Sequence, residues 1–169
     1  LRFSFLTDKL YPDSISIFGT TFKYTELNIN WQEDIFTREH FPLSFSKAIN
    51  IRGNSKLSAK NVWEVNRLQF LSFIAHNYRK TGSDIYLNQF IGILTSWIDG
   101  NPYLIGINWY SNIEINIRLI VFFFCWQLLD ADKLISRNPE FKEFVESKWM
   151  PAIFQHCRYS FSNPSKYSS

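Results

Sequence analysis

The chain has 169 residues, of which 46% are hydrophobic and 18% aromatic. This length fits one domain with a sizeable core, and the composition excludes disorder of the whole chain. The net charge of +3, from 18 Lys and Arg against 15 Asp and Glu, is too small to indicate a nucleic-acid-binding protein, which needs a concentrated basic patch. The charge is compatible with an acidic polysaccharide as partner but does not predict one.

The aromatic and cysteine residues say little about function by themselves. Most of the 17 Phe, 8 Tyr and 6 Trp are expected in the core, and the alternative is exposed rings of the kind found in carbohydrate clefts. Cys125 and Cys157 have neither metal-ligand nor disulfide-framework spacing. Cys125 lies in the apolar run 119–126, which predicts burial; eight residues are too few for a membrane span.

No signal-peptide pattern opens the chain, and because it starts at Leu1 we expect a processed product or an excised piece.

Residues 1–57 predict an N-terminal arm of short strands and loop. Residues 14–18 and 21–24 alternate apolar and polar side chains around Gly19, which predicts a short hairpin. From residue 30 to residue 54 no period is sustained, and Pro42 and Gly53 interrupt the pattern. We interpret this stretch as a long ordered connection, of a length that is often functional.

The pattern becomes helical after Ser58. One helix is predicted to run to about residue 80, where Gly82 supplies a left-handed end. Ser83 is expected to cap a second helix, over about 84–99, which Gly100 stops. Helix, glycine, capping residue and helix together predict an antiparallel helix hairpin.

Two further helices are predicted after the loop 101–109. Ser111 and Glu114 form a capping-box pattern before a helix over about 112–130, which is apolar enough to be buried. Pro139 is expected to start a fourth helix, and Pro151 to kink or divide it. Residues 160–169 are predicted to be loop. Paired helices after an arm indicate an α/α hairpin array, but they do not distinguish a bundle, a solenoid and a toroid.

Two polar clusters stand out in the absence of a phosphate loop, a nucleophile elbow or a zinc-ligand helix. In the first, Arg67 is spaced to stack on Trp63 and to pair with Glu64. In the second, Asn108 and Trp109 precede Glu114 and Arg118, which are spaced as a pair on one helix face. Both clusters are equally explained as ordinary stabilising pairs. The histidines are far apart in sequence, and His76 is expected to be a packing residue with its ring nitrogens satisfied.

Six segments follow one another at characteristic spacing: Asn30-Trp31-Gln32-Glu33-Asp34, residues 62–70 (VWEVNRLQF), Thr81-Gly82, residues 97–103 (WIDGNPY), Gly106-Ile107-Asn108-Trp109 and residues 113–118 (IEINIR). Their order resembles the N-terminal helical domain of the heparinase II/III-like polysaccharide lyase family. The resemblance covers roughly residues 28–169. It implies a mainly α fold, an incomplete (α/α) toroid of antiparallel helix hairpins, followed by a β-sandwich domain.

The resemblance also implies a reaction. Members of the family cleave uronate-containing polysaccharides by β-elimination: a neutralising group stabilises the uronate carboxylate, and a Tyr or His base removes the C5 proton. The elimination itself needs no cofactor. Export to the periplasm or the cell surface is what the family usually implies.

The catalytic set of the family is expected beyond this chain. Its neutralising Asn and an adjacent His follow a Tyr-Ser segment, and this sequence ends at Tyr167-Ser168-Ser169. Tyr159 and Tyr167 are therefore not assigned as catalytic. The residues expected to form the wall of the substrate cleft are Trp63, Glu64, Asn66, Arg67, Asn108, Trp109, Glu114 and Arg118. The sequence thus predicts an inactive substrate-cleft scaffold, with residues 58–169 as the front part of the toroid.

Two other functions stay open. The first is a non-catalytic glycan-binding or polysaccharide-assembly protein on the same fold. The second is an unrelated toroid glycoside hydrolase, which needs two acidic residues flanking a sugar; Asp84, Asp99, Glu114 and Asp130 are the candidates. The open end of a partial toroid also predicts an exposed apolar face and self-association through it.

Overall fold

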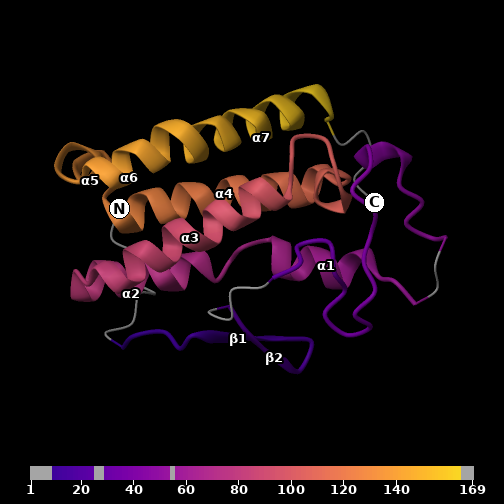
Figure 1. The fold of residues 1–169 in the computed structure, drawn as a ribbon, viewed down its shortest axis with the longest axis horizontal. Coiled ribbons are helices and arrows are strands. Elements are labelled where there is room, and N and C mark those ends of the chain that lie inside the picture. Colours follow the sequence, from indigo (N-terminus) through magenta and orange to yellow (C-terminus); the bar gives the residue numbers. More distant parts are fainter. Residues whose placement is uncertain (1–8, 25–28, 54–55, 165–169) are drawn as a thin grey trace.

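The computed structural model describes residues 9–24, 29–53 and 56–164, and over these residues the chain is mainly helical (Figure 1). A two-stranded hairpin lies against a layer of helices whose long members run side by side. The elements are β1 (Ser14–Ile17), β2 (Thr20–Lys23), the 3-10 turn η1 (Ser46–Ala48), α1 (Ala59–Asn66), α2 (Leu71–Thr81), α3 (Asp84–Gly100), the 3-10 turn η2 (Ile107–Trp109), α4 (Asn112–Leu129), α5 (Ala131–Arg137), α6 (Pro139–Phe144), the π-helical turn η3 (Val145–Trp149) and α7 (Met150–Ser162).

The predicted hairpin is confirmed. β1 and β2 pair antiparallel, with Ser14 opposite Lys23 and Ile17 opposite Thr20. Between the strands Phe18 and Gly19 both take positive φ, of 46° and 85°. The left-handed conformation suits glycine, and it closes the two-residue turn.

The single helix predicted from residue 59 to about 80 is wrong, because the chain breaks between α1 and α2. Leu68 sits at the break with φ of 58°, a left-handed conformation that costs a non-glycine residue about 1–2 kcal/mol. Leu68 and Phe70 are both fully buried. In a continuous helix their side chains would point about 160° apart, so only one of them could face the core. Burying both side chains contributes about 1.5–3 kcal/mol each, which offsets the strain.

The hairpin of α2 and α3 is confirmed, but the side-chain caps are not. Gly82 ends α2 with φ of 66°, and its N–H donates to the Tyr78 carbonyl at 2.7 Å. Ser83 and Ser111 precede α3 and α4 as expected, yet neither side chain makes a capping hydrogen bond. The capping-box prediction is therefore wrong, because the carboxylate of Glu114 binds Arg67 instead.

The C-terminal region contains more helix than predicted. The side chain of Asn138 accepts a hydrogen bond from the Phe141 N–H at 2.9 Å, which starts α6 at Pro139 as expected. The helix is divided near Pro151, as expected: the π-helical turn η3 separates α6 from α7, and Pro151 lies in the first turn of α7, where a residue without an N–H is tolerated. The helix α5 was not predicted, and α7 continues through residues 160–162, where loop was expected. Residues 165–169 of the predicted tail, with Tyr167, lie outside the described residues.

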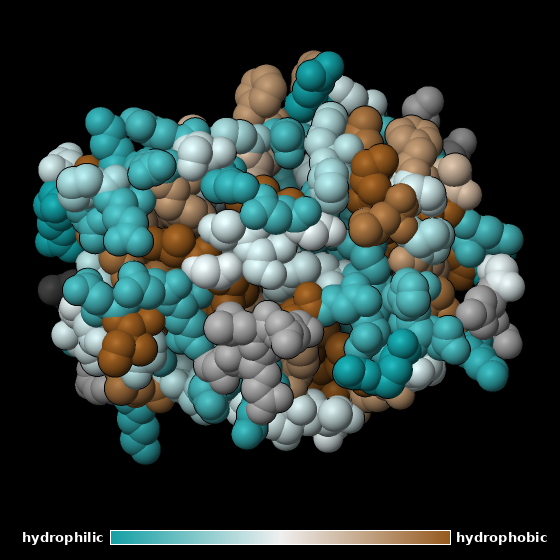
Figure 2. Space-filling view, viewed as in Figure 1, coloured by the Kyte–Doolittle hydropathy of each residue, from teal (hydrophilic) through white to brown (hydrophobic). Residues whose placement is uncertain are grey.

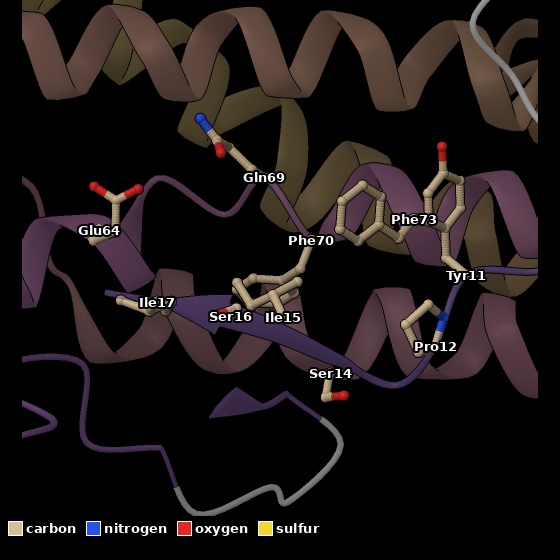
Figure 3. A pocket seen from close by; sticks show the side chains of 10 residues that line it. All are labelled: Tyr11, Pro12, Ser14, Ile15, Ser16, Ile17, Glu64, Gln69, Phe70 and Phe73. Atoms are coloured by element: carbon tan, nitrogen blue, oxygen red, sulfur yellow. The ribbon is translucent and has the colours of Figure 1, made fainter. Parts of the chain in front are cut away.

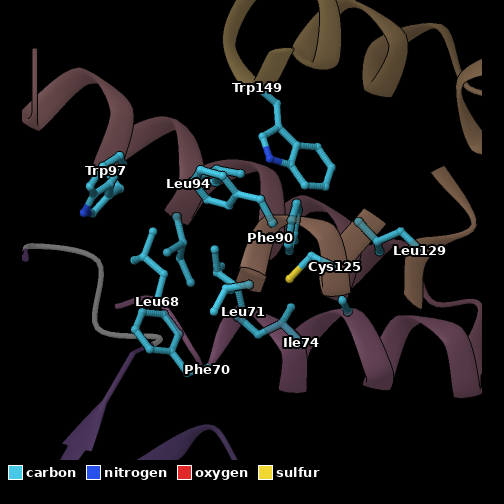
Figure 4. Close-up of a cluster of buried hydrophobic side chains, with 14 of the residues drawn as sticks. Leu68, Phe70, Leu71, Ile74, Phe90, Leu94, Trp97, Cys125, Leu129 and Trp149 are labelled. Carbon is cyan, nitrogen blue, oxygen red and sulfur yellow. The ribbon is translucent and has the colours of Figure 1, made fainter. Parts of the chain in front are cut away.

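The main core fills the space between α2, α3, α4 and the η3–α7 segment, and residues of the arm belong to it (Figure 4). Trp149 lies at its centre against Phe90, with ring centroids 5.2 Å apart. Cys125 is fully buried as predicted, and burial raises the pKa of its thiol. By length and composition α4 could span a membrane, but Cys125 and seven other residues of α4 are buried within the protein, and the helix packs on α2 and α7. We interpret α4 as a core helix.

Apolar side chains also remain on the surface. The face seen in Figure 2 shows hydrophobic patches separated by hydrophilic side chains. Exposed apolar side chains gather on α4 and α7, namely Ile113, Ile120, Phe123, Met150, Phe154 and Phe161. Between these helices lies an apolar groove of about 450 Å³, which Phe122, Trp126 and Ile153 help to line. Self-association through this face stays a prediction.

Candidate functional site

The residues predicted for the cleft wall lie at one end of the molecule. There α1, η2, the first turns of α4 and the last turns of α7 come together (Figure 1). Asn66, Asn108, Trp109 and Arg118 are fully buried, while Trp63, Glu64 and Arg67 are partly exposed. The structure therefore divides the predicted set into a buried support and a partly exposed edge.

Four carboxamides form the buried support. Asn108 donates to the Trp31 carbonyl and to Asn101 Oδ1, both at 2.8 Å. Asn66 donates to the same Trp31 carbonyl at 3.0 Å. Gln32 Nε2 donates to Asn101 Oδ1 at 2.7 Å, and Gln32 Oε1 accepts from a backbone N–H of η2. These bonds tie the connection 29–53 to α1, to the end of α3 and to η2.

Two tryptophan N–H groups complete this network. Trp97 donates to Asn66 Oδ1 at 2.8 Å, and Trp109 donates to the Asn101 carbonyl at 3.0 Å. Gly106 allows the close approach of Gln32: a Cβ at this position would lie 2.5 Å from Gln32 Oε1, and its φ is 82°. The network is thus a joint between several elements, although Asn108 Oδ1 is buried without a hydrogen-bond partner among the described residues.

Arg118 and His156 lie beneath this joint and are fully buried. Arg118 Nε donates to His156 Nε2 at 3.0 Å, and Nη2 donates to the Asn108 carbonyl at 2.6 Å. Because Nε2 accepts, the imidazole proton is on Nδ1, which donates to the Ala152 carbonyl at 2.7 Å. The guanidinium lies over the Trp97 ring, 4.9 Å from its centroid. The predicted pairing of Arg118 with Glu114 is replaced by these contacts.

Burial lowers the pKa of both residues of this pair. Desolvation lowers the pKa of Arg118 to about 9, although the charge of Glu114 opposes the shift. Desolvation, reinforced by the positive charge of Arg118, holds the pKa of His156 well below its usual value of 6.5. At neutral pH the arginine is therefore charged and the histidine neutral.

Arg67 joins two carboxylates at the partly exposed edge. Its Nε and Nη2 donate to the two oxygens of Glu114, at 2.8 and 3.0 Å, and its Nη1 donates to Glu64 Oε2 at 2.5 Å. The predicted Glu64–Arg67 pair is confirmed, whereas the link to Glu114, across 47 positions in sequence, was not predicted. The hydrogen bond to Glu114 raises the pKa of Arg67. One guanidinium thus lies between two carboxylates, and the positive charge of the buried Arg118 also acts on Glu114.

Trp63 packs beside this edge, but not as predicted. Its ring stacks on Tyr110, with centroids 6.4 Å apart, and its N–H donates to the Ile107 carbonyl at 3.0 Å. Lys47 Nζ donates to the Tyr110 carbonyl at 2.6 Å and lies 5.2 Å from the Tyr110 ring centroid and 5.5 Å from that of Tyr159. Tyr159 is therefore a packing residue here.

Several supporting residues were missed by sequence reasoning. Gln32 and Asn101 lie in segments that resembled the family, but nothing in their spacing showed that they are buried together. His156 had no distinguishing local pattern. His76 is buried and packs edge-on to the Tyr11 ring at 5.1 Å, as expected of a packing residue. Neither of its ring nitrogens has a hydrogen-bond partner among the described residues, so the expectation that its nitrogens are satisfied is wrong.

Within the part of the chain that the structure describes, no group of three or more His, Cys, Asp or Glu side chains is placed to hold a metal ion. The acidic residues weighed for a hydrolase are dispersed: Asp99 pairs with Lys148 at 2.5 Å and Asp130 with Lys133 at 2.7 Å.

Comparison with known proteins places the chain in a family. The family model described as Heparinase II/III N-terminus matches residues 1–167, which is nearly the whole sequence. No curated protein and no solved structure matches the chain. Because the match covers far more than half of its length, the chain belongs to the heparinase II/III N-terminal family.

Proposed function

We propose that this chain forms one wall of a cleft that binds uronate-containing acidic polysaccharide in a polysaccharide lyase-like protein. The family supports a polysaccharide substrate and an extracytoplasmic location, at the periplasm or the cell surface. We further propose that residues 58–169 are the front part of an incomplete (α/α) toroid and that residues 1–57 are its arm.

One feature of the site supports an acidic ligand in particular. Residues 40–63 contain Lys47, Arg52, Lys56 and Lys60 but no Asp or Glu. All four are exposed, and they lie in η1, in α1 and in the chain between them, beside Trp63. A run of cations without carboxylates attracts a polyanion and raises its local concentration.

The roles within the predicted wall follow from burial. Trp63, Glu64 and Arg67 are partly exposed and are proposed to face the glycan. Glu114 holds Arg67 in place through two hydrogen bonds. The fully buried residues, Asn66, Asn108, Trp109 and Arg118, cannot touch a polymer in this arrangement, so we propose that they position the wall.

The elimination itself is proposed to depend on groups outside this chain. A β-elimination needs a base that reaches the C5 proton. His156 is buried and both ring nitrogens are occupied, by Arg118 and the Ala152 carbonyl. His76 is buried as well, whereas His40 is exposed. The burial of His76 and His156 supports the proposal that this chain alone is inactive.

The test measures ultraviolet absorbance from unsaturated uronate on a panel of acidic polysaccharides, for this chain and for its full-length parent. Absorbance from the parent alone is the expected result, and absorbance from this chain alone overturns the proposed inactivity. Binding of the panel to the chain is measured in parallel. Lys60→Gln is expected to weaken binding in a salt-dependent way, whereas the matched variant Lys142→Gln, on α6, is expected to leave it unchanged.

A non-catalytic glycan-binding or polysaccharide-assembly protein is the second candidate. It needs no base, so a wall formed by Trp63, Glu64 and Arg67 would serve it equally. Binding of the panel together with no absorbance from the parent would select this candidate.

A further inference from the structure

A cavity of about 330 Å³ lies between β1 and the junction of α1 with α2 (Figure 3). Its volume is at the lower end of the range of about 300–1,000 Å³ that small-molecule sites occupy. Glu64 lines the cavity, so it adjoins the partly exposed edge of the cleft wall. Its other walls are aromatic, aliphatic and hydroxyl side chains.

Two stacked rings form one wall of the cavity. Tyr11 and Phe73 lie with their centroids 4.4 Å apart and their planes 12° apart. Asn77 holds Tyr11 through both backbone groups: its Oδ1 accepts from the Tyr11 N–H at 2.8 Å, and its Nδ2 donates to the Tyr11 carbonyl at 3.0 Å. Phe70 is held from behind by stacking on Tyr24 at 4.9 Å. The rings are therefore fixed before any ligand arrives.

Two polar side chains, Glu64 and Gln69, reach the cavity from opposite sides of the helix break (Figure 3). In an unbroken helix residues five apart point about 140° away from each other. The left-handed Leu68 between them re-aims the chain so that both line one wall. Backbone strain of this kind is often found at functional sites.

Both polar groups have hydrogen-bonding capacity to spare. Glu64 Oε2 is bound by Arg67, while over the described ranges Glu64 Oε1 and the Gln69 amide make no hydrogen bond. Ser14 and Ser16 add hydroxyls from β1. Flat rings with a few convergent amide, carboxylate and hydroxyl groups suit a sugar ring, whose C–H face is apolar and whose edge carries hydroxyls.

The charge of the cavity selects among sugars. Among the described residues that line it, Glu64 is the one charged side chain, while Lys23 lies opposite Ser14 in the β1–β2 pair. A uronate or sulfate placed beside Glu64 would be repelled by its carboxylate in a partly enclosed space, where screening is weak. A neutral sugar has no such penalty.

We propose that this cavity is a subsite for an uncharged sugar residue of the glycan. The inference rests on the proposed polysaccharide-binding function and extends it: the ligand carries neutral as well as acidic units. The neutral unit packs against the Tyr11–Phe73 pair and forms hydrogen bonds with Glu64 and Gln69.

The test compares neutral glycosides with a glucuronide, which differs from the glucoside only at C6. Methyl glycosides of glucose, galactose and N-acetylglucosamine, and the methyl glycoside of glucuronic acid, are titrated into the chain while amide chemical shifts are followed by NMR. At least one neutral glycoside is expected to shift the Gln69 side-chain amide and to bind at least ten-fold more tightly than the glucuronide. Binding of none of them, or equal binding of the glucuronide, overturns the proposal.

Matched variants locate the effect. Gln69→Ala is expected to weaken binding of the neutral glycoside several-fold. Gln127→Ala, which replaces another exposed glutamine, on α4, is expected to leave that binding unchanged. Glu64→Gln is expected to reduce the difference in affinity between the glucoside and the glucuronide. Unchanged affinities in both Gln69→Ala and Glu64→Gln would overturn the site. If the neutral glycosides fail these tests but acidic polysaccharide binds the chain in a Lys60-dependent way, only the proposed subsite is refuted. If acidic polysaccharide does not bind either, the proposed function is refuted as well.

Discussion

Replacement of Asn101 by alanine is the most informative perturbation of the buried carboxamide network. Asn101 lies directly after α3 and is 3% exposed. Its Nδ2 donates to the Trp97 carbonyl at 2.8 Å, and its Oδ1 accepts from Gln32 at 2.7 Å and from Asn108 at 2.8 Å. It is therefore the node at which the arm, α3 and η2 are joined.

The magnitude follows from the partners that each variant leaves behind. Three lost hydrogen bonds at about 1 kcal/mol each, with N–H groups of Gln32 and Asn108 left unpaired, give a loss of about 3–5 kcal/mol for Asn101→Ala. Asn108→Ala removes two hydrogen bonds. The Trp31 carbonyl still accepts a hydrogen bond from Asn66, and Asn101 Oδ1 still accepts one from Gln32. No acceptor loses its last partner, so the loss should be only about 2 kcal/mol.

Urea unfolding followed by tryptophan fluorescence measures both variants against Asn88→Ala, an exposed asparagine on α3 that should change the free energy of unfolding by about 0.5 kcal/mol or less. The expected order of destabilisation is Asn101→Ala, then Asn108→Ala, then the control. Equal losses for the first two variants would refute the argument from stranded partners. A loss for Asn101→Ala no larger than that of the control would refute the network itself.

Three further predictions concern stability and accessibility. Gly106→Ala should destabilise the protein strongly, because the new Cβ would lie 2.5 Å from the Gln32 carboxamide oxygen and the residue has a φ of 82°. Gly92→Ala, which has open space in α3, should stabilise the protein by about 0.5–1 kcal/mol. Similar urea midpoints for the two variants would contradict this prediction. The pKa of His156 is lowered in the folded protein, so below about pH 6.5 the unfolded chain takes up a proton that the folded chain does not. The free energy of unfolding should therefore fall as pH falls. A free energy of unfolding that stays constant from about pH 7 to about pH 5 would contradict this prediction. A thiol reagent should label exposed Cys157 in the folded protein, and Cys125 only after unfolding; mass spectrometry that finds both labelled at once would refute the burial of Cys125.

Local chemistry determined which parts of the fold could be predicted. The β1–β2 turn at Gly19 and the end of α2 at Gly82 were predictable, because a glycine with positive φ has a short-range sequence signature. The break at Leu68 was not predictable in this way. A leucine in left-handed conformation has no local signal, and what stabilises it is the tertiary burial of Leu68 and Phe70.

The candidate site shows the same limit. The Glu64–Arg67 pair followed from helical spacing. Spacing also predicted a pair of Glu114 with Arg118, but a partner from another helix was available to each: Arg67 binds Glu114, and His156 binds Arg118. Periodicity within one helix cannot rank such contacts, because it carries no information on which helices meet.

The helix break connects the two halves of the site. At Asn66, where α1 ends, the carboxamide bridges the Val62 and Trp31 carbonyls and accepts from Trp97, so the last turn is fixed to the buried joint. Arg67 follows and crosses to Glu114 on α4, and the reversal at Leu68 then turns Gln69 into the cavity. A shift of this turn would move the arginine, the cavity wall and the joint together. We therefore expect that substitutions in the buried network, although they touch no ligand, will change glycan affinity as well as stability.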